Sequence, residues 1–182
     1  MTCIVALKHK GVIYMGADSA GVGGYSLSVR TDPKIYRSGS LLFGFTTSFR
    51  MGQLLGHAFT MPTHHRDVPI EKFMATTFIN SVRQCLKDGG YAKKENDVEK
   101  GGTFLVAYSG RIFRVDDDYQ VGTTRVPFDA VGCGFELALG SLHATHAIAK
   151  SIHPKARIRL ALRAAECFSA GVRGPFLIEE LK

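Results

Sequence analysis

Residues 2–19 read TCIVALKHKGVIYMGADS. Two apolar runs, at residues 3–7 and 12–17, flank a short polar segment that ends in Gly11. Apolar runs of this length on either side of a glycine-containing turn are typical of two antiparallel strands. The sequence therefore predicts a β-hairpin at the start of the chain, with Asp18 directly after its second strand.

Further strands are indicated by short apolar runs bounded by turn residues. The next two, at residues 34–36 and 41–45, are separated by a turn at Ser38-Gly39 and are expected to extend the same sheet. A second set is expected at residues 103–108, 112–115 and 128–131, and the alternating segment 175–181 is expected to be the last strand.

Four helices are predicted between and after these strands. Ser48 suits the cap of the first, which runs to Phe59, and Gly89-Gly90 ends the second, whose apolar residues recur at helical spacing from Ile70. Two more are expected at about residues 136–151 and 154–170.

This order of elements predicts the fold class. Strands and helices come in blocks, which favours an α+β protein over a doubly wound sheet. Two antiparallel sheets packed face to face, each covered by a helix pair, would bury every apolar face. We therefore expect a four-layer αββα sandwich that forms a single domain over residues 1–182.

The composition argues against two classes of partner. The 23 Lys and Arg against 16 Asp and Glu give a net charge of +7, which could suit a nucleic acid, but the basic residues are scattered and form no recognition motif. No apolar run approaches the ~20 residues of a membrane helix, and no cleavable leader is recognised. We expect no nucleic-acid partner, no membrane partner and a cytoplasmic location.

No cofactor or metal is expected. His143 and His146 lie three residues apart on a predicted helix, but no third ligand is placed beside them. The glycine-rich segment 21–24 lacks a phosphate-loop lysine and indicates a flexible turn, and residues 116–118 indicate a turn. The cysteines form no C-x-x-C pair and are expected to be reduced core residues: Cys3, Cys85, Cys133 and Cys167.

Thr2 is the strongest candidate for a catalytic residue. Only Met1 precedes it, and an initiator methionine is commonly removed when the next residue is small. The mature chain would then carry a hydroxyl and a free amine on one residue. A threonine hydroxyl needs an adjacent base, and an α-amine with a pKa of about 7.7 to 8.0 suits that role at neutral pH.

Three segments resemble the opening of HslV and of proteasome β subunits: TCIVA at residues 2–6, GADS at 16–19 and PKI at 33–35. The resemblance implies that Thr2 is the nucleophile and that Asp18 and Lys34 complete its site. A cationic Lys34 would lower the pKa of the threonine hydroxyl and amine. Asp18 would hold Lys34 in place and partly balance its charge.

The resemblance extends to four more site residues, with two departures. Thr47 stands where the family has a glycine whose backbone N–H binds the oxyanion, so its side chain is expected to crowd the substrate. Cys133 stands in place of a serine and is a weaker hydrogen-bond partner. Glu166 and Ser169 match an acidic residue and a serine that complete the site. Tyr36, Phe45 and Phe49 are candidates for the substrate pocket.

The resemblance implies a threonine-type endopeptidase subunit of a closed homo-oligomeric double ring that degrades unfolded polypeptides. No ATP-binding motif is recognised, so a separate AAA+ ATPase of the HslU type would unfold folded substrates. Activity requires removal of Met1, because an acylated amine cannot act as a base. The alternatives are a catalytically impaired ring or scaffold subunit, which the Thr47 and Cys133 departures favour, a small-molecule amidase on the same fold, and a basic nucleic-acid-binding protein.

Overall fold

Two larger antiparallel sheets form the centre of the chain. The computed structural model describes residues 1–148 and 151–182. The first sheet has the order β12-β1-β2-β13, with bounds Phe128–Gly132, Cys3–His9, Val12–Ala17 and Leu177–Leu181. The second has the order β11-β10-β9-β6-β5, with bounds Val121–Gly122, Arg111–Val115, Phe104–Tyr108, Leu41–Phe45 and Ile35–Ser38.

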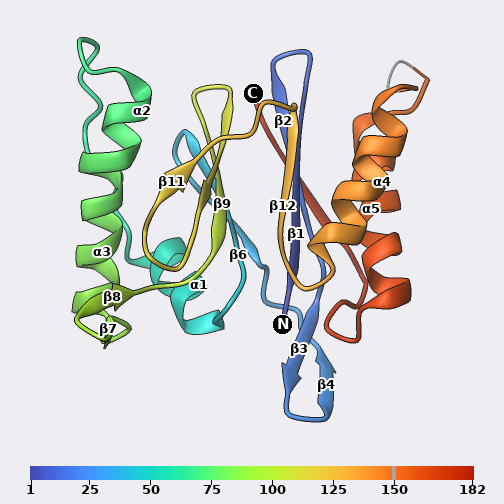
Figure 1. Ribbon diagram of the computed structural model, residues 1–182, viewed down its shortest axis with the longest axis horizontal. Coiled ribbons are helices and arrows are strands. Elements are labelled where there is room, and N and C mark those ends of the chain that lie inside the picture. The colour runs from blue at the N-terminus through green and yellow to red at the C-terminus, as the bar shows by residue number, and fades with distance from the viewer. Residues whose placement is uncertain (149–150) are drawn as a thin grey trace.

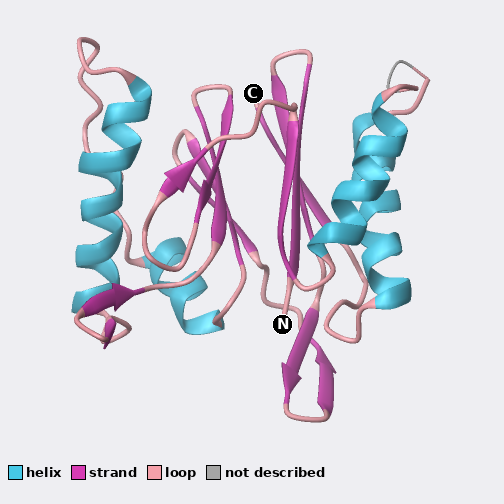
Figure 2. Ribbon diagram, in the orientation of Figure 1, coloured by secondary structure: helices cyan, strands magenta, loops and turns pink. Residues whose placement is uncertain are grey.

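The longer helices lie outside the two sheets. Figure 1 shows α2 and α3 on the side of the second sheet and α4 and α5 on the side of the first, and Figure 2 separates the helices from the strands by colour. The helical segments are α1 (Phe49–His57), α2 (Ile70–Phe73), the π-helical η1 (Met74–Phe78), α3 (Ile79–Asp88), α4 (Phe135–His146) and α5 (Pro154–Phe168). The α+β class is therefore confirmed. Among the described residues, none of the helices combines the length and apolar character of a membrane span.

The predicted helix signals have the expected local geometry. The Ser48 hydroxyl caps α1 by accepting a hydrogen bond from Arg50 N at 3.1 Å. Gly90 follows α3 with a φ of 70°, the left-handed conformation in which many helices end. Pro154 occupies the first turn of α5, where its missing N–H leaves no intrahelical bond unmade.

Buried apolar residues form three clusters. One lies between the sheets and combines Ile4 and Met15 of the first sheet with Leu42 and Leu105 of the second. Another joins the second sheet to α1 and α3, and the third joins the first sheet to α4 and α5. Both faces of each sheet are thus buried in the middle of the strands, which explains the continuous apolar runs in the sequence.

Several sequence expectations are corrected by the structure. Strands β5 and β6 do not extend the first sheet but pair in the second, where Gly44 lies opposite Leu105, while β12 joins β1 of the first sheet. The apolar pattern located these three strands, but it contains no information about their partners. Helix α4 ends at His146 and α5 at Phe168, short of Ser151 and Ala170; residues 149–150 lie outside the described residues.

Two short hairpins were also missed. The segment expected to be a flexible turn forms β3 (Ala20–Gly23) and β4 (Ser26–Val29), and the segment expected to be a polar loop forms β7 (Lys93–Glu95) and β8 (Val98–Lys100). Neither has an apolar core of its own, so no hydrophobic alternation marks it in the sequence. The turn at residues 117–118 is confirmed.

Gly44 marks a close approach of the two sheets and gives a stability prediction. A Cβ at this position would lie 2.5 Å from Ile4 Cγ2 and 2.7 Å from Met15 Sδ. We expect Gly44→Ala to lower the free energy of unfolding by about 1–3 kcal/mol, because the added methyl overpacks the core. Urea unfolding followed by circular dichroism measures the change.

Gly140 in α4 supplies the matched control, because an added Cβ there meets no heavy atom within 4 Å. Gly140→Ala should raise the free energy of unfolding by about 0.5–1 kcal/mol through helix propensity. Equal stability of the two variants would contradict the packing argument.

Candidate active site

Thr2 is buried at the start of β1, with 3% of its surface exposed. Its carbonyl oxygen accepts a hydrogen bond from Cys133 N at 2.7 Å, and its hydroxyl donates to the Met1 carbonyl oxygen at 2.7 Å. Gly132, opposite Cys3 in the ladder, has a φ of 94°, and a Cβ there would lie only 2.0 Å from the Thr2 carbonyl oxygen. Glycine is therefore required for β12 to hold the chain start this closely.

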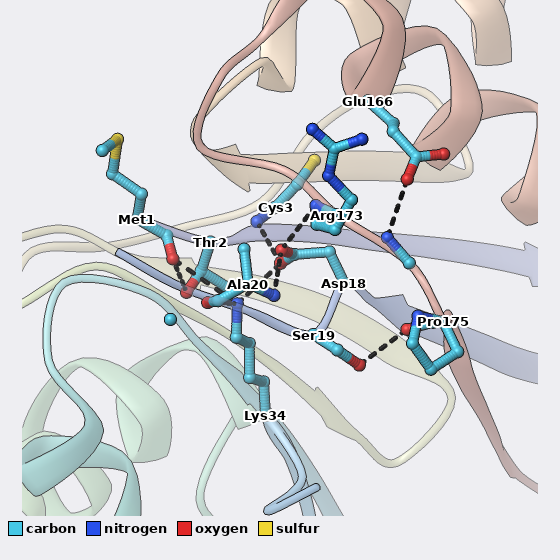
Figure 3. Close-up of polar contacts among 12 residues, drawn as sticks. Met1, Thr2, Cys3, Asp18, Ser19, Ala20, Lys34, Glu166, Arg173 and Pro175 are labelled. Atoms are coloured by element: carbon cyan, nitrogen blue, oxygen red, sulfur yellow. Dashed lines mark hydrogen bonds and ion pairs between the residues drawn. The ribbon is translucent and has the colours of Figure 1, made fainter. Parts of the chain in front are cut away.

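Asp18 is buried where β2 ends and accepts four hydrogen bonds (Figure 3). Its Oδ1 accepts from Cys3 N and from Lys34 Nζ, both at 2.9 Å. Its Oδ2 accepts from Ala20 N at 2.8 Å and from Arg173 N at 3.2 Å. Three backbone donors and one ammonium therefore fix the orientation of this carboxylate.

Lys34 lies directly before β5, with 1% of its surface exposed, and its ammonium points toward the chain start. Besides Asp18, Nζ donates to the Ala20 carbonyl oxygen at 2.6 Å and to the Met1 carbonyl oxygen at 3.4 Å. Burial lowers the pKa of the Lys34 ammonium, and the adjacent Asp18 opposes that shift. The structure thus brings Thr2, Asp18 and Lys34 together, as the sequence predicted.

Cys133 and Met1 approach the same glycine, Gly171. A Cβ added to Gly171 would lie 2.8 Å from Met1 Sδ and 3.0 Å from Cys133 Sγ, so both sulfur atoms lie beside this glycine. Cys133 also donates its backbone N–H to Thr2. Cys133 therefore lies next to the chain start through its backbone, and a role for its side chain stays a prediction.

Glu166 and Ser169 are less direct members of this group. Glu166 Oε1 accepts a hydrogen bond from Gly174 N at 2.8 Å, and the neighbouring Arg173 N donates to Asp18. Glu166 therefore acts on the site through the backbone of residues 173–174. Ser169 ends α5, and the hydrogen bonds found for it among the described residues involve its backbone, to Ala165 and Val172.

Thr47 follows β6 with a φ of 59° and is exposed. Its hydroxyl oxygen accepts a hydrogen bond from Thr103 N at 3.1 Å. This hydrogen bond holds the side chain toward Thr103, and no pattern in the sequence indicates it.

The three proposed pocket residues occupy different surroundings. Phe45 is buried in the core against Gly52 of α1, and Tyr36 stacks on it with a ring-centroid distance of 6.1 Å. Phe49 alone approaches the ion pair, with its ring centroid 5.6 Å from Lys34 Nζ and 3.9 Å from the Arg30 guanidinium carbon. A cavity of about 570 Å³ adjoins Tyr36, and one of about 630 Å³ adjoins Asp18 and Lys34.

Sequence reasoning missed the backbone groups that complete the site. The Ala20 carbonyl and the Arg173 N–H contact Lys34 and Asp18, but a backbone group can be supplied by any residue, so the sequence contains no signal for it. Within the described parts of the chain, no group of three or more His, Cys, Asp or Glu side chains is arranged to hold a metal ion.

Comparisons with known proteins identify the fold. Two structures of BPH from Thiobacillus denitrificans, one in complex with epoxomicin, match with a TM-score of 0.82, at 22% and 24% identity over 99% of this chain and 98% and 97% of theirs. Eukaryotic HslV from Trypanosoma brucei matches with a TM-score of 0.71 at 14% identity, over 99% of both chains. Anbu (ancestral beta-subunit) from Yersinia bercovieri matches with a TM-score of 0.67 at 12% identity, over 100% of this chain and 81% of its own.

These likenesses are structural. No family model and no curated protein matches the sequence. At these identities the comparison establishes the fold alone, and the fold is that of HslV and the proteasome β type, as the sequence resemblance implied.

The buried ion pair gives a second prediction. Asp18→Asn would leave the Lys34 ammonium buried without a counter-charge, so we expect the free energy of unfolding to fall by about 3–5 kcal/mol. The control is Asp32→Asn, which breaks the Arg30–Asp32 pair with 38% and 33% of the two side chains exposed and should cost about 1 kcal/mol or less. Equal losses in thermal or urea unfolding would show that burial of the pair has no special weight.

Cys3 gives a prediction on pH. Burial, assisted by Asp18, raises the pKa of its thiol from 9.0 to about 12. Between pH 9 and pH 12 the Cys3 thiol is deprotonated in the unfolded chain but stays protonated in the folded chain. Its contribution to the free energy of unfolding is therefore full below pH 9 and decreases as the pH rises toward 12. In this range the Cys3 thiol should lower the free energy of unfolding by up to about 1.4 kcal/mol per pH unit.

Urea unfolding at several pH values from 8 to 11 measures this slope. Cys3→Ala should remove it, while Cys167→Ala, at an exposed thiol, should leave it unchanged. A wild-type slope retained by Cys3→Ala would exclude the thiol as its source.

Proposed function

We propose that this chain is a threonine-type endopeptidase subunit of a self-compartmentalised ring protease of the HslV and proteasome kind, active once Met1 is removed. In this proposal residues 1–182 form one domain, a four-layer αββα sandwich. The observation that carries the proposal is the buried Lys34 ammonium, which is held by Asp18 and directed at the carbonyl joined to the Thr2 nitrogen.

Met1 removal would convert the Thr2 nitrogen from an amide into an amine with a basic lone pair. The Thr2 hydroxyl would then attack the scissile carbonyl carbon, and the amine would take the hydroxyl proton directly or through water. Lys34, as a neighbouring cation, would stabilise the developing alkoxide and lower the pKa of the amine. The Thr47 N–H would hold the oxyanion.

The second half of the reaction reverses these roles. The amine returns its proton to the departing peptide nitrogen, which leaves an ester between Thr2 and the acyl part of the substrate. Water, deprotonated by the same amine, then hydrolyses the ester and regenerates the hydroxyl. The carboxylate of Asp18 remains bound to Lys34 throughout and does not transfer a proton.

The assembly part of the proposal rests on the fold. A homo-oligomeric double ring would enclose the sites and restrict them to unfolded polypeptides, and an AAA+ ATPase would supply such chains from folded proteins. Likeness to HslV supports this arrangement. A cytoplasmic location belongs to the same proposal. The competing proposal, a ring subunit without activity, is favoured by Thr47 and Cys133 at positions where the family has glycine and serine.

The decisive experiment combines intact mass with labelling. The purified protein should lack the mass of one methionine, hydrolyse fluorogenic peptides and accept epoxomicin, the compound present in one BPH structure, on Thr2. Thr2→Ala should abolish both hydrolysis and labelling. Retained Met1 together with absent labelling would favour the inactive scaffold subunit.

Lys34→Ala tests the role of the ammonium. We expect kcat to fall by about 100- to 10,000-fold, the range for loss of a group that assists proton transfer. Circular dichroism should still show a folded chain, of lower stability than wild type: the Asp18 carboxylate loses its counter-charge but keeps three backbone N–H donors. Lys72→Ala, an exposed lysine on α2, is the control and should keep full activity. Retained turnover in Lys34→Ala would remove Lys34 from the mechanism.

A further inference from the structure

Thr47 adopts a backbone conformation that β-branched residues rarely take. Its φ of 59° lies in the left-handed region, at the junction between β6 and α1. For a residue with a branched Cβ such a φ is a genuine outlier. It persists only where surrounding contacts hold it, and such positions concentrate at functional sites.

The contacts that hold Thr47 come from two other threonines. Thr103 N donates to Thr47 Oγ1 at 3.1 Å, and the Thr103 carbonyl oxygen accepts from Thr46 N at 3.0 Å and from Thr46 Oγ1 at 2.6 Å. The Thr46 and Thr47 hydroxyl oxygens lie 3.3 Å apart. Both backbone groups of Thr103 are therefore bound by the two threonines, and we call Thr46, Thr47 and Thr103 the threonine clamp.

The strand ladder and a glycine make room for the clamp. Phe45 lies opposite Phe104 in the pairing of β6 with β9, so Thr46 and Thr103 continue the same ladder by one position. A Cβ on Gly102 would lie 3.0 Å from both Cβ and Oγ1 of Thr47 and 2.7 Å from Met51 Sδ. Glycine at position 102 thus leaves the space that the Thr47 side chain occupies.

The clamp borders the chain start directly. A Cβ placed on Gly132 would lie 2.7 Å from Thr46 Cγ2 and 2.0 Å from the Thr2 carbonyl oxygen. Gly132 therefore separates the Thr46 methyl group from the Thr2 backbone, with no side chain between them. A change in the conformation of residues 46–47 would be felt next to Thr2.

We propose that the Thr47 hydroxyl is a positioning group for the reaction, because it holds the peptide between Thr46 and Thr47 in the orientation that presents the Thr47 N–H to the oxyanion. This inference rests on the proposed function. Glycine adopts a positive φ at little cost, whereas here the hydrogen bond to Thr103 offsets the cost for threonine. The same bond turns the side chain toward Thr103.

Three substitutions on the Met1-free protein test the kinetic consequence. Thr47→Ser keeps the hydroxyl, and its kcat should stay within about twofold of wild type. Thr47→Val keeps the shape but loses the acceptor, and misplacement of the N–H should lower kcat about 100-fold with KM nearly unchanged. Thr47→Gly keeps the left-handed turn without the hydrogen bond, and its kcat should lie between those of Thr47→Ser and Thr47→Val. Wild-type kcat in Thr47→Val, or a change in KM alone, would overturn the proposal.

Hydrogen exchange at the Thr103 amide, measured by NMR, provides a readout that needs no catalysis. The amide should be protected in wild type and in Thr47→Ser, and should exchange about tenfold faster or more in Thr47→Val, while the amides of β9 stay protected as a control for folding. If wild type hydrolyses no peptide, the proposed function fails, but exchange still tests the clamp. Equal exchange rates of the Thr103 amide in wild type and Thr47→Val would show that the Thr47 hydroxyl does not bind Thr103 in solution.

Discussion

The ion pair between Lys34 and Asp18 is the constraint on which the other features of the site depend. Two opposite charges with almost no exposed surface are tolerated only when paired and fully hydrogen-bonded. Asp18 meets this condition with backbone donors from β1, from its own turn and from the segment after α5. With Lys34, one carboxylate thus connects the end of β2 to the start of β1, to the residue before β5 and to the segment after α5.

The pair also links the two sheets. Asp18 follows β2 of the first sheet and Lys34 precedes β5 of the second, so their contact lies at one end of the interface whose middle is packed by Ile4, Met15 and Leu42. Gly44 of the second sheet approaches Ile4 and Met15 of the first so closely that a Cβ has no room there. The ion pair and the core between the sheets therefore both join the first sheet to the second.

Backbone geometry, more than side-chain identity, completes the site. Cys133 N binds the Thr2 carbonyl oxygen, Gly132 admits the chain start, and Glu166 acts through Gly174. The threonine clamp extends this principle, because a hydroxyl here holds a backbone turn in which glycine is the usual choice.

The sequence by itself determined the initial hairpin and the helix-end signals, because these depend on local spacing of apolar and capping residues. Its resemblance to HslV and proteasome β subunits marked Thr2, Asp18 and Lys34 as candidate site residues. Only the tertiary structure decided which sheet β5, β6 and β12 join, that Glu166 reaches Gly174, and that Thr47 binds Thr103. Pairing between segments such as β6 and β9 is set by burial of both faces of a sheet at once. That condition involves residues far apart in the chain, and no local pattern contains it.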